Sequence, residues 1–421
     1  MHDTTTRSDD VLIVGSGPAG AMAARELARA GLKVRVLEQG FAAPVAVPSL
    51  WRLWRRREML YIAPGVALLR GMRVGGGSSA FFHTAIAPPL GMFARHGVDL
   101  EPHVQAVLTE VPHAPLAPAL MGAGAAALYK AGVQLGLPWA PLPKMIDQTR
   151  CQGSTCSPEA FWSAADLLAE AQAHGAALET GVAVRRVRLE TGRATGVETA
   201  DGRILAAGRV VLTAGGIGTP AILRRSGVAN AGNGFFCDPL RIVMARAPYS
   251  PEATPALPMT AGFIDAAAGY MLSDITVPDS LYRTFALGAG RLDMLTQPRR
   301  AMMVMVKIRD DILGEVRGNG TAWRHFSAAD KARMRSGVVL ARELLRAAGG
   351  GLPFLSPWVA AHPGGSVRLG AVLDARLACH AVPNLHVCDA AALPEAWGLP
   401  PTITILALAR YLSQVILEQT S

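Results

Sequence analysis

Short apolar segments and glycine-rich turns alternate at the beginning of the chain. Val11–Val14 is wholly apolar, Lys33–Leu37 alternates apolar and basic residues, and an alanine-rich stretch runs between them from about Pro18 to Ala30. Brief apolar segments bounded by turn residues are typical of strands, and a longer stretch rich in alanine is typical of a helix. The pattern therefore predicts a strand, a helix and a second strand over residues 10–40.

Three glycines lie at the first turn of this unit, in the spacing GxGxxG. Gly15 permits a tight turn, Gly17 lets the backbone approach a pyrophosphate at the helix N-terminus, and Gly20 lets helix and strand pack closely. Glu38 follows the second strand, placed to accept hydrogen bonds from a ribose diol. The order of all these parts predicts a dinucleotide site. The motif alone does not separate FAD from NAD, but its N-terminal position favours FAD.

Other segments give weaker indications. Residues 114–129 are apolar but interrupted by Pro115 and Pro118, and we expect a buried helix there. The chain has no long charge-free apolar run without proline and no apolar signal core at its N-terminus, so we expect a cytoplasmic protein. Cys151 and Cys156 lack a matching Cys or His pair, which argues against zinc. We expect no metal site and reduced thiols.

Length and charge set the broad class. The chain has 421 residues, half of them apolar, which predicts about two domains, and its net charge is +9. Arg52 and Arg55–Arg57 cluster with Trp51, Leu53 and Trp54. This cluster is either a solvated loop or helix, or a docking patch for a membrane surface, a carrier protein or an anionic substrate. No nucleic-acid motif is present.

Three further segments resemble the glucose–methanol–choline (GMC) oxidoreductases. Residues 70–80, RGMRVGGGSSA, are similar to the family stretch that wraps the flavin pyrophosphate. Residues 209–228 resemble its second signature, a strand, a small-residue turn and a helix. At the C-terminal end, HPGGSVRLG from His362, NLHVCDAAALP from Asn384 and TILALA from Thr404 are similar to "HPxGTxRMG", "NLxVxDASxxP" and "TIMALA".

The resemblance implies an α/β fold with two lobes. It implies a discontinuous FAD-binding domain of residues 1–92, 150–235 and 363–421, and a substrate domain of residues 93–149 and 236–362 with a second sheet. The chain is short for the family. We expect the trimming to fall on the substrate domain and to leave the flavin face open to a bulky or carrier-bound substrate.

The resemblance also implies the cofactor and its contacts. The cofactor would be FAD, held without a covalent bond because Ala80 occupies the position of the attaching histidine. Asp389 and the Ala390 N–H would face the pyrophosphate and ribityl chain, and Val184 would lie on the adenine. The predicted cofactor-binding residues are Gly15, Gly17, Ala19, Gly20, Glu38, Gln39, Arg73, Gly75, Gly76, Ser78, Ser79, Val184, Ala214, Gly215, Asp389, Ala390, Pro401 and Thr402.

His362 matches the family histidine that takes a proton from a substrate alcohol while hydride moves to flavin N5. The position of its usual Asn or His partner is occupied by Pro400, which has no side-chain donor. Phe82 stands where an Asn is frequent, and His83 after it is a candidate for the missing partner. Either His362 works alone, another residue substitutes, or the chemistry differs.

Three functions follow. The first is oxidation of a CH–OH group of a small-molecule substrate, hydrophobic or carrier-bound, with O₂ or a redox partner as electron acceptor. The second keeps FAD but performs desaturation, isomerisation, lyase chemistry or photodecarboxylation, which Pro400 favours. The third is a non-catalytic flavoprotein that passes electrons to a partner.

Overall fold

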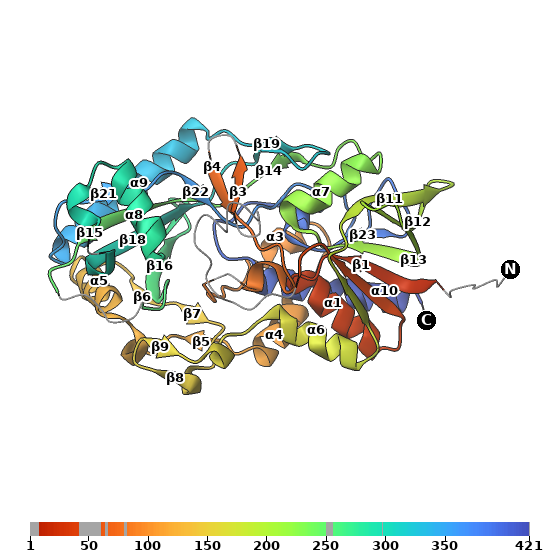
Figure 1. Ribbon diagram of the computed structural model, residues 1–421, viewed down its shortest axis with the longest axis horizontal. Coiled ribbons are helices and arrows are strands. Elements are labelled where there is room, and N and C mark those ends of the chain that lie inside the picture. Colours follow the sequence, from red (N-terminus) through yellow and green to blue (C-terminus); the bar gives the residue numbers. More distant parts are fainter. Residues whose placement is uncertain are drawn as a thin grey trace.

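Two large β-sheets with their helices form most of the protein. The computed structural model describes residues 8–41, 60–63, 66–79, 82–249, 256–296 and 298–420. One sheet lies at the end of the molecule that holds both chain termini, and the other lies at the opposite end (Figure 1). The Trp/Arg cluster at residues 51–57 lies outside the described residues. Within those residues no helix is long and apolar enough to cross a membrane.

The first sheet contains the predicted strand–helix–strand unit. β1 (Asp9–Val14) is paired in parallel with β2 (Val34–Glu38), and α1 (Pro18–Arg29) connects them, so the prediction for residues 10–40 is confirmed. The strand order is β10-β2-β1-β13-β12-β11, with β23 on β13. The remaining bounds are β10 (Ala177–Thr180), β11 (Val184–Glu190), β12 (Arg193–Thr199), β13 (Ile204–Leu212) and β23 (Leu385–Val387).

Helices pack on the first sheet and on one another. α1 packs between α6 (Ala164–Ala173) and α10 (Thr402–Glu418), and α4 (Glu101–Glu110) packs on α10. α7 (Gly215–Arg225) packs on β11. Almost every residue of α1 from Ala19 to Ala28 is buried, because alanine and glycine let the neighbouring helices approach closely. This packing holds the glycine turn before α1 in place.

The second sheet has nine strands in the order β3-β4-β22-β15-β18-β17-β16-β6, with β21 on β15. Its bounds are β3 (Leu60–Ala63), β4 (Val66–Leu69), β6 (Ala140–Pro141), β15 (Pro239–Arg246), β16 (Ala261–Asp265), β17 (Tyr270–Asp274), β18 (Ala301–Ile308), β21 (Phe354–Leu355) and β22 (Val359–Ala360).

The two faces of this sheet differ, as β18 shows. Met302, Val304, Val306 and Ile308 face α9 (Ala328–Ala347) and α5 (Ala123–Gln134). Side chains alternate along a strand, so Met303, Met305 and Lys307 share the opposite face. Met303 and Met305 join an apolar cluster that includes residues of α8 (Asp279–Gly288), with Phe82 and Leu399 at its margin. We call this the methionine-rich cluster. Lys307 is the charged residue on this face of β18.

The predicted domain boundaries stay a prediction, and two segments pack with the other predicted domain. β4, which falls within 1–92, is paired with β22 of the second sheet. α4, which falls within 93–149, packs on α10 and belongs to the same hydrophobic core as α1. Both connections follow from apolar burial: Val107 of α4 and Leu68 of β4 are completely buried in these positions.

Shorter elements link the two sheets. β14 (Asn233–Phe235), β19 (Leu313–Val316) and β20 (Ala322–Trp323) form a small sheet, and α3 (Gly91–Ala94) precedes α4. The expectation of a helix over residues 114–129 is wrong in its first half. Ala114–Pro115 is strand β5, paired with β7 (Pro143–Lys144), and helix α5 begins only at Ala123. Pro115 and Pro118 explain the difference, since proline disfavours a helix interior.

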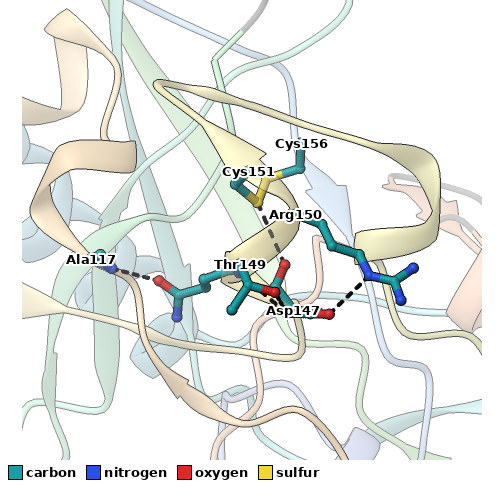
Figure 2. The surroundings of a disulfide bond; sticks show 7 residues. Ala117, Asp147, Thr149, Arg150, Cys151 and Cys156 are labelled. Carbon is teal, nitrogen blue, oxygen red and sulfur yellow. Dashed lines mark hydrogen bonds and ion pairs between the residues drawn. A yellow bond between two sulfur atoms is a disulfide. The ribbon is translucent and has the colours of Figure 1, made fainter.

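The expectation of reduced thiols is also wrong at one pair. Cys151 and Cys156 form a disulfide (Figure 2). They lie opposite each other in the hairpin of β8 (Cys151–Gln152) and β9 (Thr155–Cys156), with a Cα–Cα distance of 4.0 Å. Cys237, Cys379 and Cys388 are free and buried. Disulfides persist mainly in oxidising compartments, so this bond gives no support to the predicted cytoplasmic location, which stays a prediction.

Candidate active site

The glycine turn between β1 and α1 is built for close backbone approach. Gly15 has φ 110°, and a Cβ there would stand 2.4 Å from the Thr213 carbonyl oxygen. A Cβ on Gly20 would stand 2.0 Å from the Gly15 carbonyl oxygen. Gly17 is the N-cap of α1 and makes no side-chain cap, and Ala19 is buried in the first turn. The N-terminus of α1 therefore presents backbone N–H groups that a phosphate could accept.

Glu38 lies at the end of β2, directly beside this turn. Its Oε2 accepts hydrogen bonds from the Ser16 N–H at 3.0 Å and the Ser16 hydroxyl at 2.6 Å, and its Oε1 accepts from the Gly40 N–H at 2.7 Å. A carboxylate has about four acceptor positions, so one remains for a ribose hydroxyl. Gln39 is exposed next to it.

The glycine-rich loop at residues 71–79 packs onto the same turn. A Cβ on Gly76 would stand 2.7 Å from the Gly17 Cα, and a Cβ on Gly40 would stand 2.6 Å from the Arg73 Cα. The 3₁₀ turn η1 (Gly76–Ser79) follows Gly75, which has φ 81°. Two loops far apart in the sequence thus meet through glycines, as a pyrophosphate cradle requires.

Ser78 lies in this loop, and its contact with the cofactor stays a prediction. Its hydroxyl donates to the Gly75 carbonyl at 2.7 Å and accepts from the Ala164 N–H at 3.0 Å. Its single proton is therefore used within the protein, where it ties the loop to the start of α6. Of Ser79 the structure describes the backbone, within η1.

Asp389 is likewise held by hydrogen bonds within the protein, and its contact with the cofactor stays a prediction. Its Oδ2 accepts from the Gly215 N–H at 2.8 Å and the Thr219 hydroxyl at 2.6 Å, and its Oδ1 accepts from the Ala391 N–H at 2.7 Å. Burial raises the pKa of Asp389, although these hydrogen bonds oppose the rise. The carboxylate thus joins the N-terminus of α7, which follows Ala214, to the turn η7 (Ala390–Ala392).

Two predicted contacts lie at other elements of the first lobe. Val184 begins β11, is 9% exposed, and is paired with Thr199. Pro401 is the N-cap of α10, without a side-chain cap, and Thr402 is its first helical residue. The uncapped N-terminus of this long helix offers further backbone N–H donors. That Val184, Pro401 and Thr402 contact the cofactor stays a prediction.

His362 lies where the two lobes meet. Its φ is 54°, and Pro363 after it lies against α7: a Cβ on Gly216 would stand 1.9 Å from the Pro363 carbonyl oxygen. Its Nδ1 lies 3.0 Å from Oδ2 of Asp238. The His362 side chain is 27% exposed, whereas that of Asp238 is 1% exposed. The exposed part of the imidazole is therefore the edge away from Asp238, which carries Nε2.

Sequence reasoning missed the charged groups behind His362. Lys307 Nζ lies 3.9 Å from the same Asp238 oxygen, and both side chains are buried. The Asp238 N–H donates to Asp310, which is paired with the buried Arg324 at 2.7 Å. A signal was present: Lys307 and Asp238 are charged residues next to or within apolar strands, where charges are seldom buried unless paired.

Burial dominates the ionisation of this group. Burial, together with the positive charge of Lys307, lowers the pKa of His362 well below its ordinary range. Burial raises the pKa of Asp238 to about 7, with the Lys307 ammonium opposing the rise, and it lowers the pKa of Lys307 to about 8. His362 is therefore neutral at neutral pH, which is the state that can accept a proton.

The candidate partner positions of His362 carry Pro400, Phe82 and His83. Pro400 is buried directly before the N-cap of α10. His83 packs against Phe161 with ring centroids 4.8 Å apart and ring planes tilted by 46°, and burial lowers its pKa to about 3. Phe82 lies at the margin of the methionine-rich cluster, in agreement with its apolar character. A role for His83 in place of the missing partner stays a prediction.

Comparison with known proteins decides the family. The profile of GMC oxidoreductases matches residues 10–240 with its N-terminal part and residues 323–409 with its C-terminal part. The chain belongs to the GMC oxidoreductase family. The resemblance inferred from the motifs is thereby confirmed, and so is FAD as the cofactor.

Relatives and solved structures agree with this assignment. The GMC oxidoreductase is 27% identical to an uncharacterised GMC-type oxidoreductase of Mycobacterium tuberculosis, over 96% of this chain and 75% of that protein. It is 24% identical to a long-chain-alcohol oxidase of Arabidopsis thaliana, over 99% of this chain and 68% of that protein. Pyridoxine 4-oxidase from Mesorbium loti has a similar structure, with a TM-score of 0.76, 18% identity, and coverage of 97% and 99%. The predicted two-lobe α/β fold is confirmed.

The residues of this GMC oxidoreductase fit FAD. A cradle of glycines without room for a Cβ lies at the uncapped N-terminus of α1, beside Glu38. Such a site suits a pyrophosphate and a ribose. We expect Gly17 and Gly76 to hold the pyrophosphate and Glu38 to accept from the ribose.

Proposed function

We propose that this GMC oxidoreductase oxidises a CH–OH group of a small organic substrate, with His362 as the base. The observation that carries the proposal is the setting of the His362 ring, whose Nδ1 edge is held by a buried carboxylate while the edge with Nε2 is exposed. A neutral imidazole with one open nitrogen is suited to accept a proton from a hydroxyl group.

The proposed reaction removes a hydride and a proton from the alcohol. FAD, when bound, would supply the two-electron acceptor for the hydride of the substrate C–H bond. Nε2 of His362 takes the hydroxyl proton, and the substrate becomes a carbonyl compound. The lowered pKa of His362 keeps the ring neutral before the reaction. Because Pro400 has no side-chain donor, the substrate hydroxyl would be oriented from the His362 side.

We further infer a substrate with an apolar body. Phe82 and Leu399 lie at the margin of the methionine-rich cluster, and Leu399 is adjacent to Pro400. Methionine side chains are flexible and adapt to apolar ligands of various shapes. A relative named as a long-chain-alcohol oxidase supports the same class. The alcohol would therefore carry a hydrocarbon chain rather than a densely hydroxylated body.

Steady-state turnover tests the proposal. We would supply primary alkanols of increasing length, with O₂ or an artificial electron acceptor, and identify the carbonyl product. The expected result is that kcat/KM rises with chain length, since each buried CH₂ contributes about 0.8 kcal/mol. Equal or falling kcat/KM with length would reject the apolar substrate. Absence of carbonyl product from every alcohol would reject the proposed oxidation.

A second candidate function rests on Pro400. It is buried at the position where the family places a side-chain donor, so the usual two-sided hold on a hydroxyl is absent. FAD chemistry without alcohol oxidation, such as isomerisation or desaturation, would need no such hold. Turnover without net electron transfer to an acceptor, or oxidation at a carbon that bears no hydroxyl group, would favour this candidate over the first.

A further inference from the structure

Asp238 and His362 are held face to face in an unusual backbone conformation. Both have positive φ values, 42° and 54°, which non-glycine residues rarely adopt. Phe236 and Gly364 exchange backbone hydrogen bonds at 3.0 and 2.9 Å, and the Ala361 N–H donates to the Cys237 carbonyl at 3.0 Å. These bonds clamp the two segments together. Strained residues that are held in this way are typical of functional sites.

Lys307 faces the same carboxylate from the second sheet. It lies on β18 opposite Leu240, two residues beyond Asp238, and its Nζ is 3.9 Å from Asp238 Oδ2. Within the described part of the chain this ammonium has no hydrogen-bond partner. Charges buried in this way are costly unless they are compensated. The fold therefore maintains a buried cation whose described electrostatic partner is the carboxylate behind His362.

Asp310, the neighbouring acid, is paired with a different cation. Asp310, which accepts the Cys237 and Asp238 N–H groups, is paired with Arg324, and Arg324 also contacts Asp330. Arg324, Asp310 and Asp330 are completely buried in their side chains. Lys307 is thus left to balance Asp238, whereas Arg324 balances Asp310 and Asp330.

We propose that Asp238, balanced by Lys307, is a positioning residue that holds the His362 proton on Nδ1 and leaves the Nε2 lone pair free for the substrate. An ionised carboxylate can only accept, so it selects the tautomer that donates from Nδ1. The pair of Asp238 and Lys307, which we call the dyad, orients the His362 ring in a site where Pro400 supplies no donor. This inference rests on the proposed function, because it assigns Nε2 of His362 as the base.

The dyad makes the rate of flavin reduction depend on pH. If Asp238 gains a proton, it donates to Nδ1, the His362 proton moves to Nε2, and the base is lost. Burial raises the pKa of Asp238 to about 7, whereas the Lys307 ammonium and the Gly398 backbone N–H oppose that rise. Asp310 is the other acid that faces this carboxylate, with Arg324 beyond it. The rate of flavin reduction should therefore fall as the pH drops through this range.

Nitrogen NMR on the ¹⁵N-histidine-labelled, FAD-loaded protein tests the tautomer without turnover. The His362 signals are assigned from their loss in His362→Gln. In the wild type we expect the proton on Nδ1 at pH 8, and in Asp238→Asn we expect this preference to be lost. The matched control is Asp274→Asn, another buried carboxylate in the second sheet, which should leave the His362 signals unchanged.

Kinetics provide the second readout. Asp238→Asn should slow anaerobic flavin reduction roughly 10²–10⁴-fold at equal FAD content, the size seen when a histidine loses its orienting carboxylate. Lys307→Met should shift the acid limb of the reduction rate to higher pH, because the charge that lowers the pKa of Asp238 is gone. A merely structural role would leave the position of this limb unmoved.

Each result either supports or overturns the inference. An Asp238→Asn protein that keeps FAD, the Nδ1 tautomer and the wild-type pH profile would overturn the inference. If that variant does not fold, the double variant Asp238→Asn/Lys307→Met removes both buried charges, and an unchanged tautomer there would overturn it equally. If no alcohol reduces the wild type, the proposed function fails, whereas the tautomer measurement still supports or rejects the dyad.

Discussion

Gly216 in the first turn of α7 lies directly against Pro363, so that a Cβ on Gly216 would stand 1.9 Å from the Pro363 carbonyl oxygen. The Ser366 hydroxyl donates to the Gly216 carbonyl at 2.8 Å. The helix that carries the Asp389-bound N-terminus and the segment that carries His362 are thereby held as one unit. The cofactor lobe and the proposed base are connected through a position that only glycine can occupy.

Gly216→Ala should destabilise the protein and slow flavin reduction, because either α7 or the His362 segment must move. Overpacking typically costs about 1–3 kcal/mol, and a clash with backbone lies at the upper end. Gly288→Ala is the control, since Gly288 is exposed near the end of α8 and a Cβ there meets nothing within 4 Å. Chemical denaturation of both variants checks this. Equal stability of the two would contradict the contact.

Gly76→Ala should impair the cofactor cradle. The new Cβ would stand 2.7 Å from the Gly17 Cα, and the φ of 54° is unfavourable for alanine. We expect lower FAD content per chain and a lower melting temperature of the cofactor-stripped protein. The adjacent Gly77 has nothing within 4 Å of its Cβ, so Gly77→Ala should melt like the wild type when stripped. Identical melting of the two stripped variants would refute the close approach of the loops.

Asp274 should make stability depend on pH. Burial raises its pKa from 3.8 to about 6, so the folded state binds the proton more tightly than the unfolded state. Its stabilising contribution is complete below about pH 4 and is lost as the pH rises through about 6, a change of about 3 kcal/mol at most. Asp274→Asn keeps an acceptor for the Thr260 and Ala261 N–H groups but does not titrate. Denaturation curves between pH 4 and 8 should show the wild type losing stability relative to this variant, and a difference with no pH dependence would count against it.

The disulfide predicts a thiol count. The chain has five cysteines, and Cys151 and Cys156 are bonded. We expect three thiols to react in denaturant without reductant and five after reduction. Cys151→Ser/Cys156→Ser should lower the free energy of unfolding by about 2 kcal/mol, as expected for a short closed loop, and should remove sensitivity to reductant. Five reactive thiols before reduction would show that the bond is absent.

Local chemistry made part of the fold predictable. The turn at Gly15, Gly17 and Gly20 was predicted because the three glycines lie within one strand–helix unit, where Gly20 packs against the Gly15 carbonyl. The helix over residues 114–129 was misplaced because the prediction relied on the apolar character of the segment and gave its two prolines too little weight. The Cys151–Cys156 bond was missed because five-residue spacing has meaning only once a hairpin sets the two residues opposite each other.

The surroundings of His362 could not be predicted in the same way. Asp238 is 124 positions from His362 in sequence, and Lys307 lies on a different strand. The pairing of β15 with β18 and the bridge between Phe236 and Gly364 bring the three together. Likewise, the hydroxyl of Ser78 bonds Gly75 and Ala164, which no sequence spacing reveals.

The measurement that tests the central claim most directly is anaerobic reduction of the bound flavin by a long-chain primary alcohol. The account predicts that the flavin absorbance of the wild type bleaches, that His362→Gln remains oxidised while retaining FAD, and that His380→Gln, at an exposed histidine, behaves as the wild type. A His362→Gln protein that bleaches as fast as the wild type would contradict the assignment of His362 as the base.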